Sequence, residues 1–127
     1  MNFAMVLLKR NLVMLVDDEI DITSLFTEVL TMNGIKVKAF SNPKEALRDF
    51  EINHASYNLV ISDIRMSPMS GVEFIKKLRE IDSNIKVILM TAFEIEGNQL
   101  TEIDTDEFFN KPIRMNDLVQ IVKKYVD

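Results

Sequence analysis

Residues 57–62 read Tyr-Asn-Leu-Val-Ile-Ser, a short run dominated by apolar side chains, and Asp63 follows it directly. Residues 11–16, Asn-Leu-Val-Met-Leu-Val, form a second such run, which ends at Asp17 and Asp18. Short apolar runs that stop at polar residues are typical of strands buried in a sheet. We therefore predict a buried strand in each segment, with acids at its carboxyl end.

Helical patterns separate these runs. Residues 21–33 carry apolar side chains at helical spacing, and Gly34 follows where a helix is expected to end. Residues 42–45, Asn-Pro-Lys-Glu, have the N-cap, proline and acid of a helix start. Ser70 and Glu73 form a capping box for a helix that is expected to reach about Ile81.

Further strands are predicted over residues 35–40, 86–90 and 107–110, and a last helix over 113–126. Strands that alternate with helices indicate βαβ units and a parallel sheet. The expected fold class is α/β, a flavodoxin-like doubly wound five-stranded parallel sheet with strand order 2-1-3-4-5. Apolar residues are sparse over residues 93–106, so a short or irregular fourth helix is expected there.

Composition narrows the class of protein. The chain has 127 residues, enough for one domain, and 47% of them are apolar. The net charge of −5 argues against a nucleic-acid-binding surface. Cysteine is absent, which excludes disulfides and thiol catalysis, and the single histidine excludes a multi-histidine metal site. His54 itself lies in a polar stretch and is expected to be solvated.

The chain is divided into residues 1–10, an N-terminal extension or the start of the first strand, and residues 11–127, the main domain. No apolar run approaches the roughly 20 residues of a membrane-spanning helix. No cleavage pattern of a signal peptide is visible either. A cytoplasmic location without membrane contact is therefore expected.

Polar residues follow four of the five predicted strands, and ligands bind at this edge of a doubly wound sheet. Asp17 and Asp18 follow the first strand, Asp63 the third, Thr91 the fourth and Lys111 the fifth. Neighbouring strands lie about 4.8 Å apart, so the three acids should crowd into one site. Such carboxylates repel one another unless a cation is present, and oxygen ligands suit Mg²⁺.

This set of residues indicates phosphoryl chemistry. Asp63 is the expected nucleophile, because carboxylates can form aspartyl-phosphates. Lys111 would place a positive charge on the opposite side of the phosphoryl group, and the Thr91 hydroxyl could donate a hydrogen bond to it. Catalysis of this kind depends mostly on positioning and charge neutralisation.

The strand-end motifs resemble the ordered signature of two-component receiver domains, including the chemotaxis-regulator type. The resemblance covers residues 12–127 and rests on residues 16–19, 60–66, 69–71, 88–92 and 111–113, which read Val-Asp-Asp-Glu, Val-Ile-Ser-Asp-Ile-Arg-Met, Met-Ser-Gly, Ile-Leu-Met-Thr-Ala and Lys-Pro-Ile. One departure is Ser67, which places the loop proline at Pro68, one position later than usual. Residues 91–111 are also about two residues shorter than usual.

The resemblance implies a role for each residue. Asp63 corresponds to the phospho-acceptor, and the Mg²⁺ ligands would be Asp17, Asp18, Asp63 and the backbone carbonyl of Arg65. Thr91 corresponds to the switch hydroxyl, Lys111 to the lysine of the site and Phe108 to the switch aromatic. A cis peptide bond is implied at Lys111–Pro112. Arg65 and Phe93 occupy the positions that tune dephosphorylation in this family.

The resemblance also implies partners. A sensor histidine kinase or phosphotransfer protein would phosphorylate Asp63, and a downstream protein would read the switched state. The face of the fourth helix commonly serves for contacts, so a weak or phosphorylation-dependent homodimer is a further expectation. The chain ends with the last helix, so we expect a stand-alone or excised receiver, with no output domain and no direct DNA binding.

Two alternatives differ in function. The first is an enzyme, a small Mg²⁺-dependent phosphohydrolase with an aspartyl nucleophile. Phosphatases that resemble the haloacid dehalogenases need a second acid two residues after the nucleophile, where this chain has Arg65. The second alternative is a degenerate receiver that only binds partners, against which the complete set of site residues argues. The leading expectation is a phospho-acceptor that is not an enzyme beyond its own phosphorylation and dephosphorylation.

Overall fold

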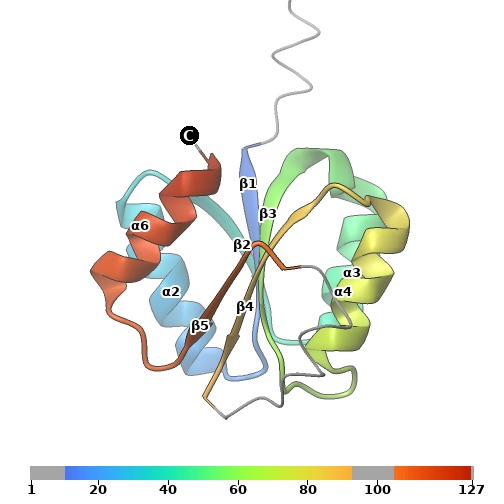
Figure 1. Ribbon diagram of the computed structural model, residues 1–127, viewed down its shortest axis with the longest axis horizontal. Helices are drawn as coiled ribbons and strands as arrows, with labels where there is room; N and C mark the ends of the chain where they lie inside the picture. Colours follow the sequence, from blue (N-terminus) through green and yellow to red (C-terminus); the bar gives the residue numbers. More distant parts are fainter. Residues whose placement is uncertain (1–10, 93–104, 127) are drawn as a thin grey trace, which may run out of the picture.

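The computed structural model describes residues 11–92 and 105–126 and contains a five-stranded parallel sheet (Figure 1). The strand order is β2-β1-β3-β4-β5, as predicted. The strands are β1 (Leu12–Val16), β2 (Lys36–Phe40), β3 (Tyr57–Asp63), β4 (Lys86–Thr91) and β5 (Glu107–Asn110). The doubly wound α/β class expected from the alternating pattern is therefore confirmed.

Helices cover both faces of the sheet. One face carries α2 (Ile20–Met32) and α6 (Met115–Val126), and the other carries α3 (Pro43–Asn53) and α4 (Gly71–Ile81) (Figure 1). A single 3-10 turn, η1 (His54–Ser56), joins α3 to β3. α2, α4 and α6 lie within two residues of their predicted ranges, and α3 begins at the predicted proline, Pro43.

The helix ends follow from local chemistry. The Asn42 side chain accepts a hydrogen bond from the Lys44 N–H at 2.9 Å, and the Ser70 hydroxyl accepts one from the Glu73 N–H at 3.2 Å. Both caps satisfy backbone donors that a first helical turn leaves without partners. Gly34 follows α2 with φ +79°, a left-handed conformation that favours glycine over other residues.

The hydrophobic core lies in two layers, one on each side of the sheet. Phe50, Phe74 and Leu78 pack on the α3 and α4 side. Phe26 and Leu30 pack against the sheet on the α2 and α6 side. The three central strands are buried on both faces, whereas β2 at one edge is partly exposed. The central strands therefore form a rigid base for the residues at their carboxyl ends.

His54 differs from its expected solvated state. It begins the η1 turn directly after α3, is half-buried, and its ring centroid lies 6.1 Å from that of Phe50. Its Nδ1 atom is buried without a hydrogen-bond partner. The turn continues the helical path and tucks the ring against the core, a contact that a polar local sequence does not reveal.

Three expectations concern residues outside the described ranges. These are the role of residues 1–10, the role of Phe93, and the irregular helix over 93–106, of which only residues 105 and 106 are described. Among the helices of the described ranges, none is long and apolar enough to cross a membrane.

Candidate functional site

The acids at the ends of β1 and β3 lie together, as the strand order requires. β1 and β3 are hydrogen-bonded neighbours, with Val16 opposite Ser62, so the residues that follow them share one edge. Asp17, Asp18 and Asp63 each offer a carboxylate oxygen, and these oxygens lie within 4.8 Å of one another. The predicted crowding of three carboxylates is thus present.

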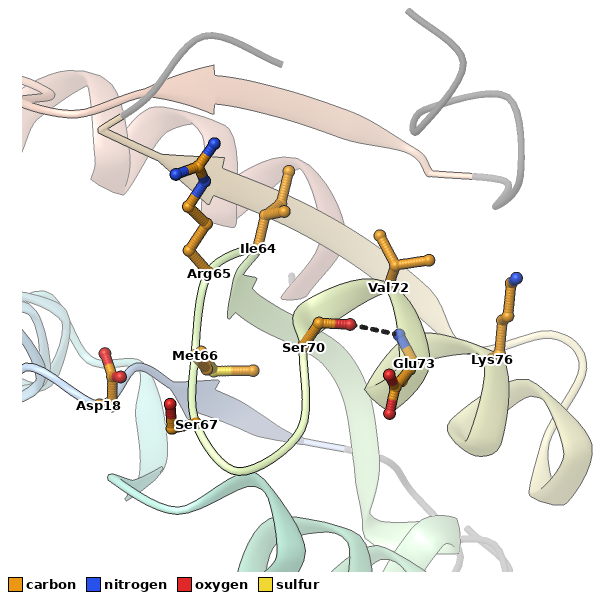
Figure 2. A pocket seen from close by; sticks show the side chains of 9 residues that line it. All are labelled: Asp18, Ile64, Arg65, Met66, Ser67, Ser70, Val72, Glu73 and Lys76. Atoms are coloured by element: carbon orange, nitrogen blue, oxygen red, sulfur yellow. Dashed lines mark hydrogen bonds between the residues drawn. The ribbon is translucent and has the colours of Figure 1, made fainter. Parts of the chain in front are cut away.

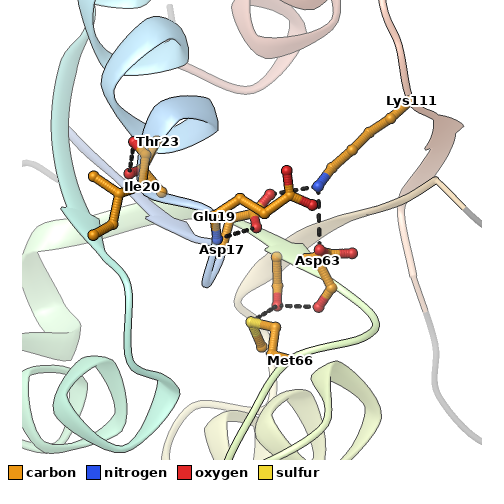
Figure 3. Close-up of polar contacts among 8 residues, drawn as sticks. Asp17, Glu19, Ile20, Thr23, Asp63, Met66 and Lys111 are labelled. Atoms are coloured by element: carbon orange, nitrogen blue, oxygen red, sulfur yellow. Dashed lines mark hydrogen bonds and ion pairs between the residues drawn. The ribbon is translucent and has the colours of Figure 1, made fainter.

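Lys111 joins two of these acids (Figure 3). Its Nζ atom lies 2.6 Å from Asp17 Oδ2 and 3.1 Å from Asp63 Oδ2. The Lys111 side chain is only 8% exposed and Asp17 is fully buried, so these ion pairs are shielded from water. The other oxygen of Asp17, Oδ1, accepts a hydrogen bond from the Glu19 N–H at 2.9 Å, which fixes the carboxylate at the start of α2.

The charges of this site shift the pKa values of two groups. Burial and the negative charge of Asp17 raise the pKa of the Asp63 carboxyl, although Lys111 partly opposes them. Burial alone would lower the pKa of Lys111, but its bonds to Asp17 and Asp63 outweigh that effect and raise the pKa. Lys111 therefore stays charged at neutral pH, and the Asp63 carboxylate is held in an unfavourable environment.

Asp18 differs from the other two acids because it is exposed. It lines a surface hollow together with Met66 and Ser67 of the loop after β3, and Ser70, which caps α4, and Glu73 of α4 lie farther along (Figure 2). The acidic cluster is therefore buried at Asp17 and open to solvent at Asp18.

Backbone contacts fix the position of Asp63. The Ile64 N–H donates to the Met90 carbonyl at 3.0 Å, and the Gly71 N–H donates to the Ile64 carbonyl at 2.7 Å. The Ser62 hydroxyl donates to the Asp63 carbonyl at 2.8 Å. A Cβ atom at Gly71 would lie 2.1 Å from the same Asp63 carbonyl oxygen, so only glycine fits without a shift. The loop from 63 to 71 is thus closed by a contact that requires glycine.

Sequence reasoning assigned no role to Gly71 or Ser62. Gly71 is one of only three glycines in the chain and begins a helix, a position where glycine is not needed for conformational freedom. That placement was the available signal of a close approach. The Ser62 contact has no comparable signal, because a serine at a strand end is common.

The remaining predicted residues occupy several environments. Thr91 is buried at the end of β4, and its carbonyl accepts the Lys111 N–H at 2.7 Å. Phe108 on β5 is partly buried and packs against the core on the α3 and α4 side. Arg65 is exposed, and its side chain extends away from Asp18 in Figure 2. Phe93 lies outside the described residues.

Two peptide bonds in the site loops are cis. One is Lys111–Pro112, where the resemblance implied a cis bond, and the other is Ser67–Pro68 in the loop after β3. The second bond falls where the sequence departs from the usual loop pattern, and the sequence did not indicate it.

The donor set fits a hard divalent cation. Three carboxylates share the site with one ammonium group, so Lys111 can balance only one of their negative charges. All three donors are carboxylate oxygens and one of them, Asp18, faces solvent, which suits an ion that keeps several of its waters. The acidic cluster could therefore hold a metal ion.

Comparisons with known proteins agree with this geometry. A family model of the response regulator receiver domain matches residues 13–123, most of the chain. This chain belongs to the response regulator receiver domain family. Members of this family are the receiver domains of two-component systems. They interact with histidine kinases or phosphotransfer proteins.

Two curated relatives differ in how much of their length this receiver domain spans. The chain is 33% identical to sporulation initiation phosphotransferase F of Bacillus subtilis over 116 residues, which are 90% of this chain and 92% of that protein. It is 32% identical over 112 residues to a homologue of the transcriptional regulatory protein CpxR from Haemophilus influenzae, covering 87% of this chain and 48% of that protein. The chain therefore spans about half the length of the second relative.

Solved structures support the receiver fold. Chemotaxis protein CheY4 of Vibrio cholerae superimposes with a TM-score of 0.81 over 92% of this chain and 99% of that protein, at 23% identity. The receiver domain of the Francisella response regulator 1452 gives a TM-score of 0.77 over 91% of this chain and 95% of that chain, at 27% identity. The likeness to CheY4, at 23% identity, supports only the fold.

Proposed function

We propose that this receiver domain accepts a phosphoryl group on Asp63 in an Mg²⁺-dependent reaction and changes conformation as a result. The observation that carries the proposal is the position of Lys111 Nζ, 2.6 Å from Asp17 and 3.1 Å from Asp63 beside a third carboxylate. A buried ammonium that binds the expected nucleophile and a neighbouring acid suits a site built to balance the charge of a phosphoryl group.

In this proposal Asp63 is the nucleophile. Its Oδ1 or Oδ2 atom forms a bond to the donor's phosphorus, and the bond between that phosphorus and the donor breaks, with its electron pair leaving on the donor. The raised pKa of Asp63 favours the protonated carboxyl, so the positive charge of Lys111 helps to keep the attacking group ionised. Lys111 then remains available to pair with a phosphoryl oxygen.

Asp17, Asp18, Asp63 and the backbone carbonyl of Arg65 would hold Mg²⁺. When bound, the ion would supply positive charge that offsets the crowded carboxylates and the incoming phosphoryl oxygens. Asp17 is held by the Glu19 N–H and by Lys111, so it offers a fixed ligand, whereas the exposed Asp18 offers an adjustable one.

Thr91 and Phe108 are the proposed switch residues. The new phosphoryl group adds roughly two negative charges. The Thr91 hydroxyl would turn toward it, and the partly buried Phe108 ring would move into the space that Thr91 leaves. The register supports this pairing, because Phe108 lies opposite Leu89 on β4, two residues before Thr91. The surface around β4 and β5 would then differ between two populations.

Arg65 and Phe93 are proposed to slow dephosphorylation by screening the phosphoryl group from water. Both side chains are large, and Arg65 follows Asp63 by two positions. The proposal for Phe93 rests on its position in the sequence alone. Phosphate loss should be faster in Arg65→Ala and Phe93→Ala than in wild type, and unchanged or slower loss in both variants would contradict the idea.

The proposed partners are a sensor histidine kinase or phosphotransfer protein and a downstream protein, in the cytoplasm and without direct contact to DNA. The domain division into residues 1–10 and 11–127, and a weak or phosphorylation-dependent homodimer, belong to the same proposal. Incubating the protein with a panel of kinases autophosphorylated on histidine should reveal transfer to wild type but not to Asp63→Asn. Transfer that persists in Asp63→Asn would refute the assignment.

The central experiment uses acetyl phosphate or beryllofluoride with Mg²⁺, followed by intact mass measurement or spectroscopy. Wild type should form an adduct that requires both Asp63 and Mg²⁺, and Asp63→Asn or a chelator should abolish it. Turnover of many phosphate esters without a stable adduct would instead support the phosphohydrolase. No response under any condition would support a receiver that acts only as an interaction module.

A further inference from the structure

β5 is the shortest strand of the sheet, and it lies at an edge. Its four residues pair with β4 from Glu107 opposite Ile88 to Asn110 opposite Thr91, and no other strand of the described ranges lies on its other side. Lys111 follows immediately after β5. The position of the site's lysine therefore depends on how this short strand is held.

The geometry of the sheet leaves little tolerance in the position of Lys111. Lys111 must extend past β4 to meet Asp63 at the end of β3 and Asp17 beyond β1. Adjacent strands lie about 4.8 Å apart, and one residue advances a strand by about 3.3 Å. A slip of β5 by one residue would also turn each of its side chains to the opposite face. A small change of register would thus remove the ammonium group from the carboxylates.

Hydrogen bonds hold β5 at both ends. At the carboxyl end the Lys111 N–H donates to the Thr91 carbonyl at 2.7 Å. At the other end the Asp106 N–H donates to the Val87 carbonyl at 3.0 Å, and the Asp106 carboxylate accepts the Val87 N–H at 2.9 Å. Val87 is fully buried, so its N–H has no access to water as a replacement partner. Both backbone groups of Val87 therefore bond to Asp106, and the Val87 carbonyl also accepts a longer bond from the Thr105 hydroxyl at 3.4 Å.

We propose that Asp106 is a positioning residue that sets the register of β5 on β4 and, through that strand, the reach of Lys111 to Asp17 and Asp63. Asp106 contacts no reacting group. Its carboxylate takes the place of a backbone carbonyl at the start of the strand ladder. The inference rests on the proposed role of Lys111 and extends it to the opposite end of β5.

Two cations near the Asp106 carboxylate provide a matched control. Lys86 Nζ lies 3.6 Å from Asp106 Oδ1, with its side chain 57% exposed, and Arg79 lies 3.9 Å from Oδ2. These exposed or long pairs should contribute little to the register. Lys86→Ala removes a charge beside Asp106 and keeps the bond to the Val87 N–H. Asp106→Asn also keeps an acceptor, whereas Asp106→Ala removes it.

The experiment compares Asp106→Ala, Asp106→Asn and Lys86→Ala by three measurements, namely Mg²⁺ affinity by calorimetry, the rate of adduct formation with acetyl phosphate, and amide hydrogen exchange of Val87 and Lys111. Asp106→Ala should bind Mg²⁺ more tightly, by roughly twofold to tenfold, because a displaced ammonium competes less for the carboxylates. Its adduct should form more slowly by a similar factor, and both amides should lose protection. The other two variants should resemble wild type.

Repeating Asp106→Ala in a Lys111→Ala background separates positioning from general loss of stability. There Asp106→Ala should not change Mg²⁺ affinity further, because the lysine through which it acts is gone. Weaker Mg²⁺ binding by Asp106→Ala, an unchanged exchange of Lys111, or equal effects of Asp106→Ala and Asp106→Asn would overturn the inference. If wild type forms no adduct, the proposed function fails, while the exchange and Mg²⁺ data still decide the role of Asp106.

Discussion

β3 ends at Asp63 and β5 leads directly into Lys111, but the two strands are held in different ways. β3 lies between β1 and β4, its last five residues are fully or nearly fully buried, and the loop after Asp63 is closed by Gly71. β5 has four residues, one neighbour and a partly exposed surface. Asp63 is thus fixed by the core, whereas Lys111 follows a short strand that pairs with β4 on one side. The two residues therefore have unequal structural support, because β3 has a neighbour on each side and β5 lies at the edge.

Removing the positive charge of Lys111, directly after β5, should have the largest effect on stability. Lys111→Ala leaves Asp17 and Asp63 close together without their shared cation, which should lower the free energy of unfolding by about 3 kcal/mol in metal-free buffer. The same change should tighten Mg²⁺ binding, because the ion no longer competes with the ammonium. Urea unfolding with and without Mg²⁺ measures both effects.

Lys111→Arg is the control for this prediction, since it keeps the charge and changes the shape. It should retain most of the stability that Lys111→Ala loses. An equal loss in both variants would show that the packing of the lysine chain, and not its charge, stabilises the site.

The second largest effect is expected at the closed loop after β3, which holds Asp63 in place. Gly71→Ala would place a Cβ atom 2.1 Å from the Asp63 carbonyl oxygen, so the loop or α4 must shift, at a cost of about 2 kcal/mol. Adduct formation at Asp63 should also slow. Thermal unfolding measures the loss of stability, and the acetyl phosphate assay measures the rate of adduct formation.

Gly34→Ala is the matched control for Gly71→Ala. Gly34 has φ +79° and open space around its missing Cβ, so alanine there should cost about 1 kcal/mol through backbone conformation alone. Its rate of adduct formation should equal that of wild type. If Gly34→Ala slowed the reaction as much as Gly71→Ala, the contact with the Asp63 carbonyl would not be the cause.

The pH dependence of stability should reveal the raised pKa of Asp63 at the end of β3. Folding raises the pKa of Asp63 above its ordinary 3.8, so the folded protein binds this proton more tightly than the unfolded chain does. The contribution of Asp63 to stability should therefore fall as pH rises from about 4 through the raised pKa. In metal-free buffer Asp63→Asn should remove this slope. A wild-type slope that survives in Asp63→Asn would assign it to other groups.

The smallest effect is expected at the opposite edge of the sheet. Lys38 on β2 lies 2.7 Å from Asp49 Oδ1, with half of its side chain exposed. Lys38→Ala should lower the free energy of unfolding by at most about 1 kcal/mol and leave the Asp63 reaction unchanged. Chemical unfolding and the acetyl phosphate assay test this. A slower reaction in Lys38→Ala would mean that the site responds to any edge strand and not to β5 in particular.

The sequence predicted the strand order and the meeting of Asp17, Asp18, Asp63 and Lys111 for one physical reason. Apolar periodicity locates the strands, and a parallel sheet brings their carboxyl ends to one edge. Residues directly after strands are therefore placed by the fold class alone. The caps at Asn42 and Ser70 were predictable because their bonding is local.

Contacts between distant backbone segments were not predictable in this way. The approach of Gly71 to the Asp63 carbonyl depends on how a loop closes, and the bonds between Asp106 and Val87 link residues 19 positions apart. The ring contact of His54 depends on the direction in which α3 ends. Residue type and spacing do not encode these distances.

The unequal exposure of the two consecutive acids has a consequence for the order of events at the site. Asp17 is enclosed by the Glu19 N–H and Lys111, whereas Asp18 faces the solvent at the hollow beside Met66 and Ser67. The exposed Asp18 carboxylate is therefore the ligand of the cluster that an ion in solution would meet first. Under the proposed function, occupancy of the site would follow the concentration of the ion in the surrounding solution, and the ion would prepare the domain before any phosphoryl donor arrives.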